Sequence, residues 1–383
     1  MQRAALTALG LVACIVATPR LVEATPQFAR TYRVDCSYCH DLPPRLNTRG
    51  WNFLQAGYRL DVEPRAFTIP VAVWNTIDLE ARHSADLVKG YPGRVEFVSS
   101  GPLGRSGAAY FAEWRALSQS IRGNRRLLNR SGRFEDLFVR APLTARGPVW
   151  ITLGQFRGLT QVDVSQRLSL SEPLAFSSSV PGERARSARL TGLRAFSASG
   201  RQPSVRAEYQ VTRNTAAPAD GWFVAATLPL AGELTIPLTD AASFELEGRP
   251  KGVFVETYRR AGLTSVGGHA FVGDQRRRLI TGVVTHDMGN RFALLASVGA
   301  FHAGGVHDMR LSIGGEATIS ASLVGGARVD HRTGQNRDPA VLLYGNGHLP
   351  FGPSSFRQAL RLQIEHRIQP ANHATAFALS HVF

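Results

Sequence analysis

The residues best suited to chemistry lie near the start of the chain, in the stretch FARTYRVDCSYCHDLPP at residues 28–44. This stretch contains Cys36, Cys39 and His40, which form a C-x-x-C-H pattern. Two thiols at this spacing can each form a thioether with a haem vinyl group, and the adjacent imidazole can coordinate the iron. The pattern predicts one covalently bound haem c, attached through Cys36 and Cys39, with His40 as the proximal iron ligand.

Other chemistries of the two cysteines fit less well. A thioredoxin-like dithiol would open a helix within a βαβ unit, and nothing around Cys36 has that pattern. A zinc site needs four ligands, and the chain has no second cysteine pair. A disulfide between Cys36 and Cys39 would suit an oxidising compartment, but it would not need His40. We therefore favour haem and keep the disulfide as an alternative.

The second axial ligand of the iron is not evident near the motif. Residues 25–69 contain no methionine and no histidine other than His40. A ligand of the usual electron-transfer kind would therefore come from the later chain, where the nearest histidine and the only methionines are His83, Met288 and Met309. Tyr38, Tyr58 or an open position remain alternatives. Each histidine after His40 is expected to be a surface or polar-face residue rather than a ligand.

A short helix is predicted directly after the motif, within LNTRGWNFLQAGYRL at residues 46–60. Asn47 or Thr48 is the expected N-cap. The expected apolar face consists of Trp51, Leu54 and Tyr58. Such a face would cover a porphyrin, or pack on a neighbouring element.

The chain opens with a pattern typical of a secretory signal. Arg3 precedes an apolar run over residues 4–17, and small residues follow near Ala24. We predict a signal peptide at 1–24, a monohaem cytochrome c segment at 25–69 and an outer-membrane β-barrel at 70–383. No apolar run outside the signal approaches the length of a membrane-spanning helix.

The formal net charge of +15 arises from 44 basic and 29 acidic residues. A strongly basic chain can bind nucleic acid, anionic lipid or acidic partners, but an exported protein rarely meets nucleic acid. We therefore expect no nucleic acid partner. Lipopolysaccharide phosphates, an anionic small molecule or haem propionates are the expected counter-charges. Arginines that line the barrel lumen, for instance Arg357, Arg361 and Arg367, could pair with propionates.

Residues beyond 69 alternate between apolar and hydrophilic side chains, as strands do. In SVRAEYQVT, Val205 and Tyr209 lie on the face opposite Arg206 and Glu208. About 310 residues, at roughly 20 per strand and turn, give about sixteen strands. The predicted fold is all-β: a transmembrane antiparallel β-barrel of about 16 strands, with a short, partly helical N-terminal haem segment packed in or at the lumen.

Three finer features are predicted within the barrel. The final stretch, HATAFALSHVF, is typical of the last strand of an outer-membrane protein, with the terminal aromatic Phe383. GEATISASLVGG, residues 315–326, alternates as a single strand. Longer loops are expected at residues 165–187 and 229–252.

The N-terminal stretch resembles the start of the fused cytochrome-porins of iron-oxidising and other bacteria. The matching positions are Phe28, Ala29, Arg30, Cys36, Cys39, His40, Pro44, Leu46, Gly50, Phe53, Gly57 and Tyr58. This resemblance implies a monohaem domain plugged into a barrel, which passes electrons between the outer surface and periplasmic electron carriers. The best-known role of the family also makes extracellular Fe(II) a candidate donor.

Two other functions remain compatible with the sequence. The first is a passive porin with an arginine-lined lumen, in which a disulfide closes the N-terminal plug. The second is a periplasmic haem enzyme with a β-rich domain. Outer-membrane lipid is an expected partner of the electron-transfer barrel and of the passive porin, but not of the periplasmic enzyme.

Overall fold

The computed structural model describes most of the chain from Pro26 onward. Its described residues are 26–35, 38–42, 45–60, 62, 64, 70–82, 88–104, 106–122, 126–129, 131–144, 147–157, 201–212, 220–235, 243–250, 252–273, 278–288, 291–303, 306–320, 322–333, 339–351, 358–370 and 372–382. The predicted signal peptide, Cys36, His83, the loop at 165–187 and Phe383 lie outside them.

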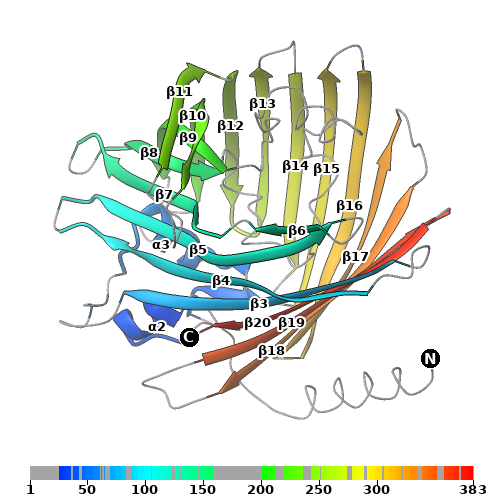
Figure 1. The fold of residues 1–383 in the computed structure, drawn as a ribbon. Coiled ribbons are helices and arrows are strands. Elements are labelled where there is room, and N and C mark those ends of the chain that lie inside the picture. The colour runs from blue at the N-terminus through cyan, green and yellow to red at the C-terminus, as the bar shows by residue number, and fades with distance from the viewer. Residues whose placement is uncertain are drawn as a thin grey trace.

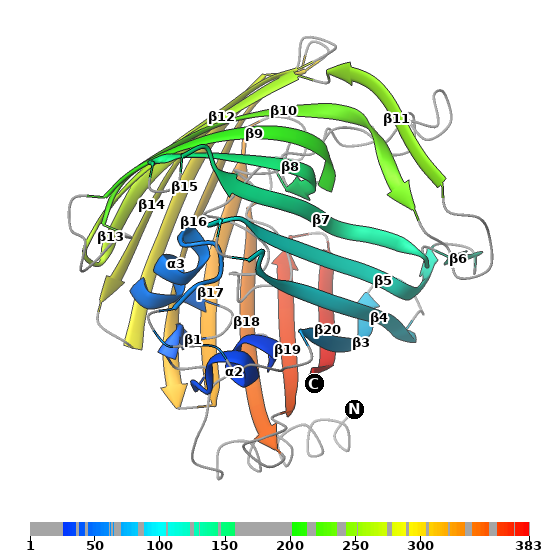
Figure 2. The ribbon, with the colours of Figure 1, turned by 90° about the vertical axis from the view of Figure 1, so that its left-hand side faces the viewer.

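Sixteen long strands, each antiparallel to its neighbours, close into a barrel (Figures 1 and 2). They are β3 (Val71–Arg82), β4 (Val88–Pro102), β5 (Ala109–Arg122), β7 (Arg133–Pro142), β8 (Val149–Arg157), β9 (Arg201–Thr212), β10 (Gly221–Thr235), β12 (Gly252–Ala261), β13 (Thr264–Gly273), β14 (Arg278–Met288), β15 (Phe292–Ala303), β16 (Val306–Ser320), β17 (Leu323–Arg332), β18 (Ala340–Phe351), β19 (Gln358–Gln369) and β20 (Asn372–Val382). Pairing of β20 with β3 closes the ring. The short strands β6 (Arg126–Asn129) and β11 (Ser243–Pro250) pair with β5 and β10. The predicted strand number is confirmed.

The two faces of the barrel wall differ in polarity in the way a membrane requires. On β9, Arg206 and Glu208 are buried, whereas Val205 and Tyr209 are exposed. On β14 an aliphatic residue also faces outward, since Ile280 is 65% exposed, but the inward residues Leu279 and Val283 are apolar. Because aliphatic side chains point outward, the outer face suits lipid. The inner face carries ionic side chains, as on β9, and an apolar cluster that includes Phe254 and Phe271. Within the described residues, no helix is long and apolar enough to cross a membrane.

Two of the finer predictions are wrong. The loop expected at 229–252 is instead the end of β10 paired with β11, with Thr235 opposite Ser243. The glycines and prolines of this stretch are typical of a loop, but here they lie in paired strands, and the pairing accommodates them with a register shift after Leu230. The strand expected at 315–326 is split, because β16 ends at Ser320 and β17 begins at Leu323. The Ser322 amide donates to Ser320 Oγ, a local bond that favours a turn.

The N-terminal segment is partly helical and lies at one end of the barrel (Figure 2). It comprises α2 (Pro26–Tyr32), β1 (His40–Leu42), β2 (Arg45–Leu46) and α3 (Thr48–Gln55). Asn47 caps α3 as predicted, because its side chain accepts a hydrogen bond from the Gly50 amide at 2.9 Å. The predicted apolar face is right only in part. Tyr58 is buried and Leu54 packs against the same core, but Gly50 and Phe53 are the buried residues of α3 itself, and the helix ends before Tyr58.

Candidate functional site

Polar side chains of the N-terminal segment attach it to the wall on β3 and β4. Gln27 Nε2 donates to Ser100 Oγ on β4 at 2.6 Å. Arg30 Nη2 donates to the carbonyl oxygen of Val71, where β3 begins, at 2.8 Å. These bonds connect α2 to residues more than forty positions away in the chain, so they fix the start of the segment to the inner wall.

Arg59 and Arg140 hold the other end of the segment. The Arg59 guanidinium donates to the carbonyls of Gly104, Gly107 and Ala108 in the β4–β5 turn, at 2.9–3.1 Å. Arg140, on β7, donates through Nη1 to the carbonyls of Leu54 (3.0 Å) and Gln55 (3.1 Å). A cation at the C-terminal end of α3 also favours the helix dipole. Sequence reasoning missed Arg140, because nothing near it in the chain indicates a helix partner.

An apolar core joins the segment to the barrel wall. Tyr32, Phe53 and Tyr58 are buried together with Ala109 of β5. Phe28 packs edge-on against Phe53, with ring centroids 4.7 Å apart. The Tyr32 hydroxyl donates to the Tyr58 carbonyl at 2.6 Å, so the one polar group of that ring is satisfied inside the core. The segment therefore shares a hydrophobic core with the wall.

The second half of the C-x-x-C-H pattern rests on the start of α3. Cys39 is buried with a free thiol, and its carbonyl accepts a hydrogen bond from the Asn47 amide at 3.0 Å. A Cβ at Gly50 would lie 2.2 Å from that carbonyl oxygen, so only glycine permits this approach. His40 follows in β1, opposite Leu46 of β2, and is partly exposed.

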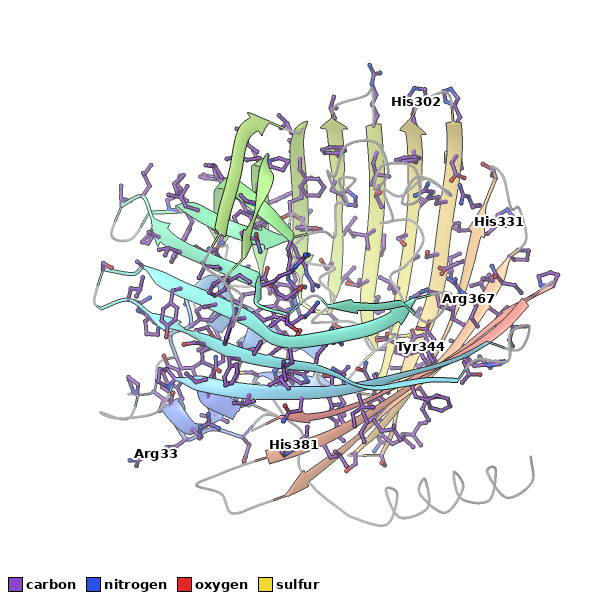
Figure 3. The ribbon with its side chains drawn as sticks, in the orientation of Figure 1. Arg33, His302, His331, Tyr344, Arg367 and His381 are labelled. Atoms are coloured by element: carbon purple, nitrogen blue, oxygen red, sulfur yellow. The ribbon has the colours of Figure 1, made fainter. Side chains whose placement is uncertain are left out.

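Burial raises the pKa of the Cys39 thiol to about 11, against the opposing field of Arg49. The free thiol is therefore protonated and poorly nucleophilic at neutral pH. Figure 3 shows Arg33 of the same segment extending away from the barrel. The structure thus places Cys39 and His40 consecutively on a segment docked at the lumen, while Cys36 is outside the described residues.

The residues of the later chain that could ligate iron differ in the face they occupy. Met288 and Met309 are each 48% exposed on the outer face, so neither can reach a haem inside the lumen. His269 and His348 are the described histidines of the barrel whose side chains are buried on the lumen side. Among the described residues, no three His, Cys, Asp or Glu side chains converge as a metal site.

Ion pairs cover much of the lumen wall beside the segment. Arg140 also binds Glu208 through Nη2, at 2.7 Å, and Arg206 binds the same carboxylate at 3.0 Å. Arg206 further pairs with Glu256, whose carboxylate accepts from the Tyr258 hydroxyl. Because these buried charges are paired and hydrogen-bonded, their mutual attraction offsets the desolvation cost of keeping them in the wall.

Arg361 on β19 is the exception. It faces the lumen between His348 and Ser380, its register partners on β18 and β20. The residue is 9% exposed, and among the described residues its Nε and Nη2 atoms have no hydrogen-bond partner. A buried guanidinium without a counter-charge is costly, and a carboxylate brought into the lumen would offset that cost. The pairing predicted between Arg361 and a haem propionate stays a prediction.

Comparisons with known proteins identify the fold. No family model matches the chain, and no curated protein matches it. The Salmonella typhi OmpF complex with daunomycin is similar at 9% identity and TM-score 0.52, over 82% of this chain and 97% of that one. A high-pH structure of Pseudomonas putida OprB is similar at 11% identity and TM-score 0.51, over 88% and 96% of the two chains. At such identities the likeness concerns architecture alone, and the chain has the closed β-barrel fold of outer-membrane porins.

Proposed function

We propose that this protein is an outer-membrane c-type haem protein that transfers electrons across the outer membrane. The observation that carries the proposal is the docking of the segment with Cys39 and His40 against the inner wall of a membrane barrel. A redox group held there would be insulated from lipid. It would also stay within reach of carriers at the mouth of the barrel.

The orientation follows from the barrel connections. In outer-membrane barrels, short turns lie on the periplasmic side and longer loops outside. The segment contacts the β4–β5 turn, at the same end as the tight β12–β13 turn of Gly262 and Leu263. The longest connection, residues 158–200, joins β8 and β9 at the opposite end. The segment would therefore face periplasmic electron carriers, and a donor such as extracellular Fe(II) would approach from the other end.

Each named residue has a distinct part in this function. Cys36 and Cys39 would anchor the haem covalently, and His40 would hold its iron from one side. The haem, when bound, supplies one-electron chemistry. Arg361 would pair with a carboxylate, and positive charge near the iron favours the reduced state, which raises the reduction potential. The wall and the segment exclude water and fix the position of the site.

The second candidate is a passive channel, and the porin architecture of the barrel favours it. The docked segment would then be a structural plug. Cys39 carries a free thiol, and Cys36, its partner in the disulfide-closed form of this plug, lies outside the described residues, so that form stays an alternative.

Proteoliposomes test the two functions against each other. The protein is reconstituted around an impermeant oxidised dye, and an impermeant reductant is added outside. Electron transfer reduces the trapped dye without leakage, and the combined Cys36→Ser and Cys39→Ser variant, which can form no thioether, abolishes the reduction. A passive channel instead conducts ions in both forms and leaves the dye oxidised. That result would reject electron transfer.

A further inference from the structure

The tip of the β15–β16 hairpin brings two imidazole rings together at the end of the barrel opposite the N-terminal segment (Figure 3). His302 lies directly opposite His307, with ring centroids 4.2 Å apart and the two Nδ1 atoms 3.0 Å apart. Their chain neighbours Phe301 and Asp308 are buried on the lumen side, so both histidines face outward. We propose that this pair is a rim site for a divalent transition metal.

The spacing of the two nitrogens agrees with adjacent positions around one metal ion. Metal–imidazole bonds are about 2.0–2.1 Å long. Two nitrogens 3.0 Å apart therefore subtend roughly 90–97° at a shared ion. A tetrahedral angle at the same bond length would need about 3.3–3.4 Å. The pair suits the cis positions of a tetragonal or octahedral ion, which favours Cu²⁺ or Ni²⁺ over Zn²⁺.

The hairpin sets this geometry before any ion arrives. Directly opposed residues of antiparallel strands hold their Cβ atoms about 4.5–5.5 Å apart, so two imidazoles can converge without strand movement. In the metal-free form the Nδ1 atoms share one hydrogen bond, with one ring as donor and the other as acceptor. When an ion binds both Nδ1 atoms, the proton of the donor ring moves to its own Nε2, and both Nδ1 atoms are satisfied at once.

The surroundings make the site open and of modest strength. Within the described chain no third His, Cys, Asp or Glu joins the pair, so water or another ligand fills the remaining positions. Arg278, opposite His302 on β14, is exposed and its charge disfavours a cation. Asp308 is turned to the lumen and paired there with Arg310 and Arg332. The β17 position opposite His307 lies outside the described residues. Because a metal competes with protons for imidazole nitrogen, acid conditions weaken binding.

Copper titration of the untagged, full-length protein in detergent tests the site. Cu²⁺ is added while its paramagnetic resonance spectrum is recorded, and the nitrogen hyperfine pattern counts the imidazoles bound. We expect two nitrogens in the native protein. His302→Gln and His307→Gln should each lose one nitrogen and at least tenfold in affinity. Arg278→Gln should bind copper more tightly.

His286→Gln is the matched control. His286 is also an exposed outward-facing histidine on the barrel, but its Nδ1 pairs with Thr264 Oγ1 rather than with another imidazole. Its replacement should leave both the affinity and the nitrogen count unchanged. The proposal is overturned if the two hairpin variants bind copper as the native protein does, or if the native spectrum shows a single nitrogen.

Discussion

Replacing Arg140 with methionine should release the end of α3 from the lumen wall. The guanidinium donates two hydrogen bonds to the carbonyls of Leu54 and Gln55. Charge-assisted hydrogen bonds contribute about 1.5–3 kcal/mol each, so even the lower value gives about 3 kcal/mol for the pair. At about 1.4 kcal/mol per tenfold, the docked state should lose roughly a hundredfold in population relative to the undocked state. Glu208 keeps its bond to Arg206, so the variant leaves no unpaired carboxylate in the wall.

Hydrogen–deuterium exchange of three amides reports this docking. The Ala56, Gly57 and Tyr58 amides donate to carbonyls in α3 and therefore exchange slowly only while the end of the helix is in place. Arg140→Met should accelerate their exchange by about two orders of magnitude.

Arg115→Met is the control for this prediction. Arg115 pairs with Glu96 and Glu135 in the same wall, and none of its described bonds reaches the segment. Its replacement should leave the three amides protected. Equal protection in the Arg140 variant and the native protein would refute the docking role of Arg140.

Four further changes test other contacts. Gly50→Ala should destabilise the segment, because the new Cβ would clash with the Cys39 carbonyl. The expected result is faster proteolysis of the N-terminal region while the barrel stays folded. Arg59→Gln should weaken the docking of the segment but leave the melting temperature of the barrel unchanged. Thermal unfolding followed with one probe on the segment and another on the strands would measure the two transitions separately. In haem-free protein, the raised pKa of the Cys39 thiol should make segment docking weaken as the pH rises from about 9 to about 11, because the thiol ionises at a lower pH in the undocked segment than in the docked one. Conversion of the thiol to a thioether should remove this pH dependence. Arg361→Leu should lower the reduction potential of the bound haem, as measured in a redox titration. An unchanged potential would show that Arg361 does not interact with the haem.

The barrel could be predicted because its physical cause is local. A strand places alternate side chains on opposite faces, and a membrane wall demands opposite polarity on those faces, so Arg206 and Glu208 against Val205 and Tyr209 already indicate the architecture. The cap at Asn47 was likewise predictable, since a side chain that accepts from the first turn acts within a few residues.

The docking of the segment could not be predicted in this way. Arg140 and Leu54 are 86 positions apart, and their contact depends on the closure of the whole barrel. The buried face of α3 could be predicted only in part, for a related reason. The close approach of the Cys39 carbonyl to Gly50 turns Gly50 and Phe53 inward, and periodicity alone carries no information about that approach.

The most direct test of the proposed function is the intact mass of the mature protein purified from outer membranes and denatured. We predict the polypeptide mass plus one covalently attached haem, and loss of the added mass when Cys36→Ser and Cys39→Ser are combined, because either thiol alone could still form one thioether. A native mass equal to that of the polypeptide alone would contradict the proposal and leave a porin-like channel with a docked plug.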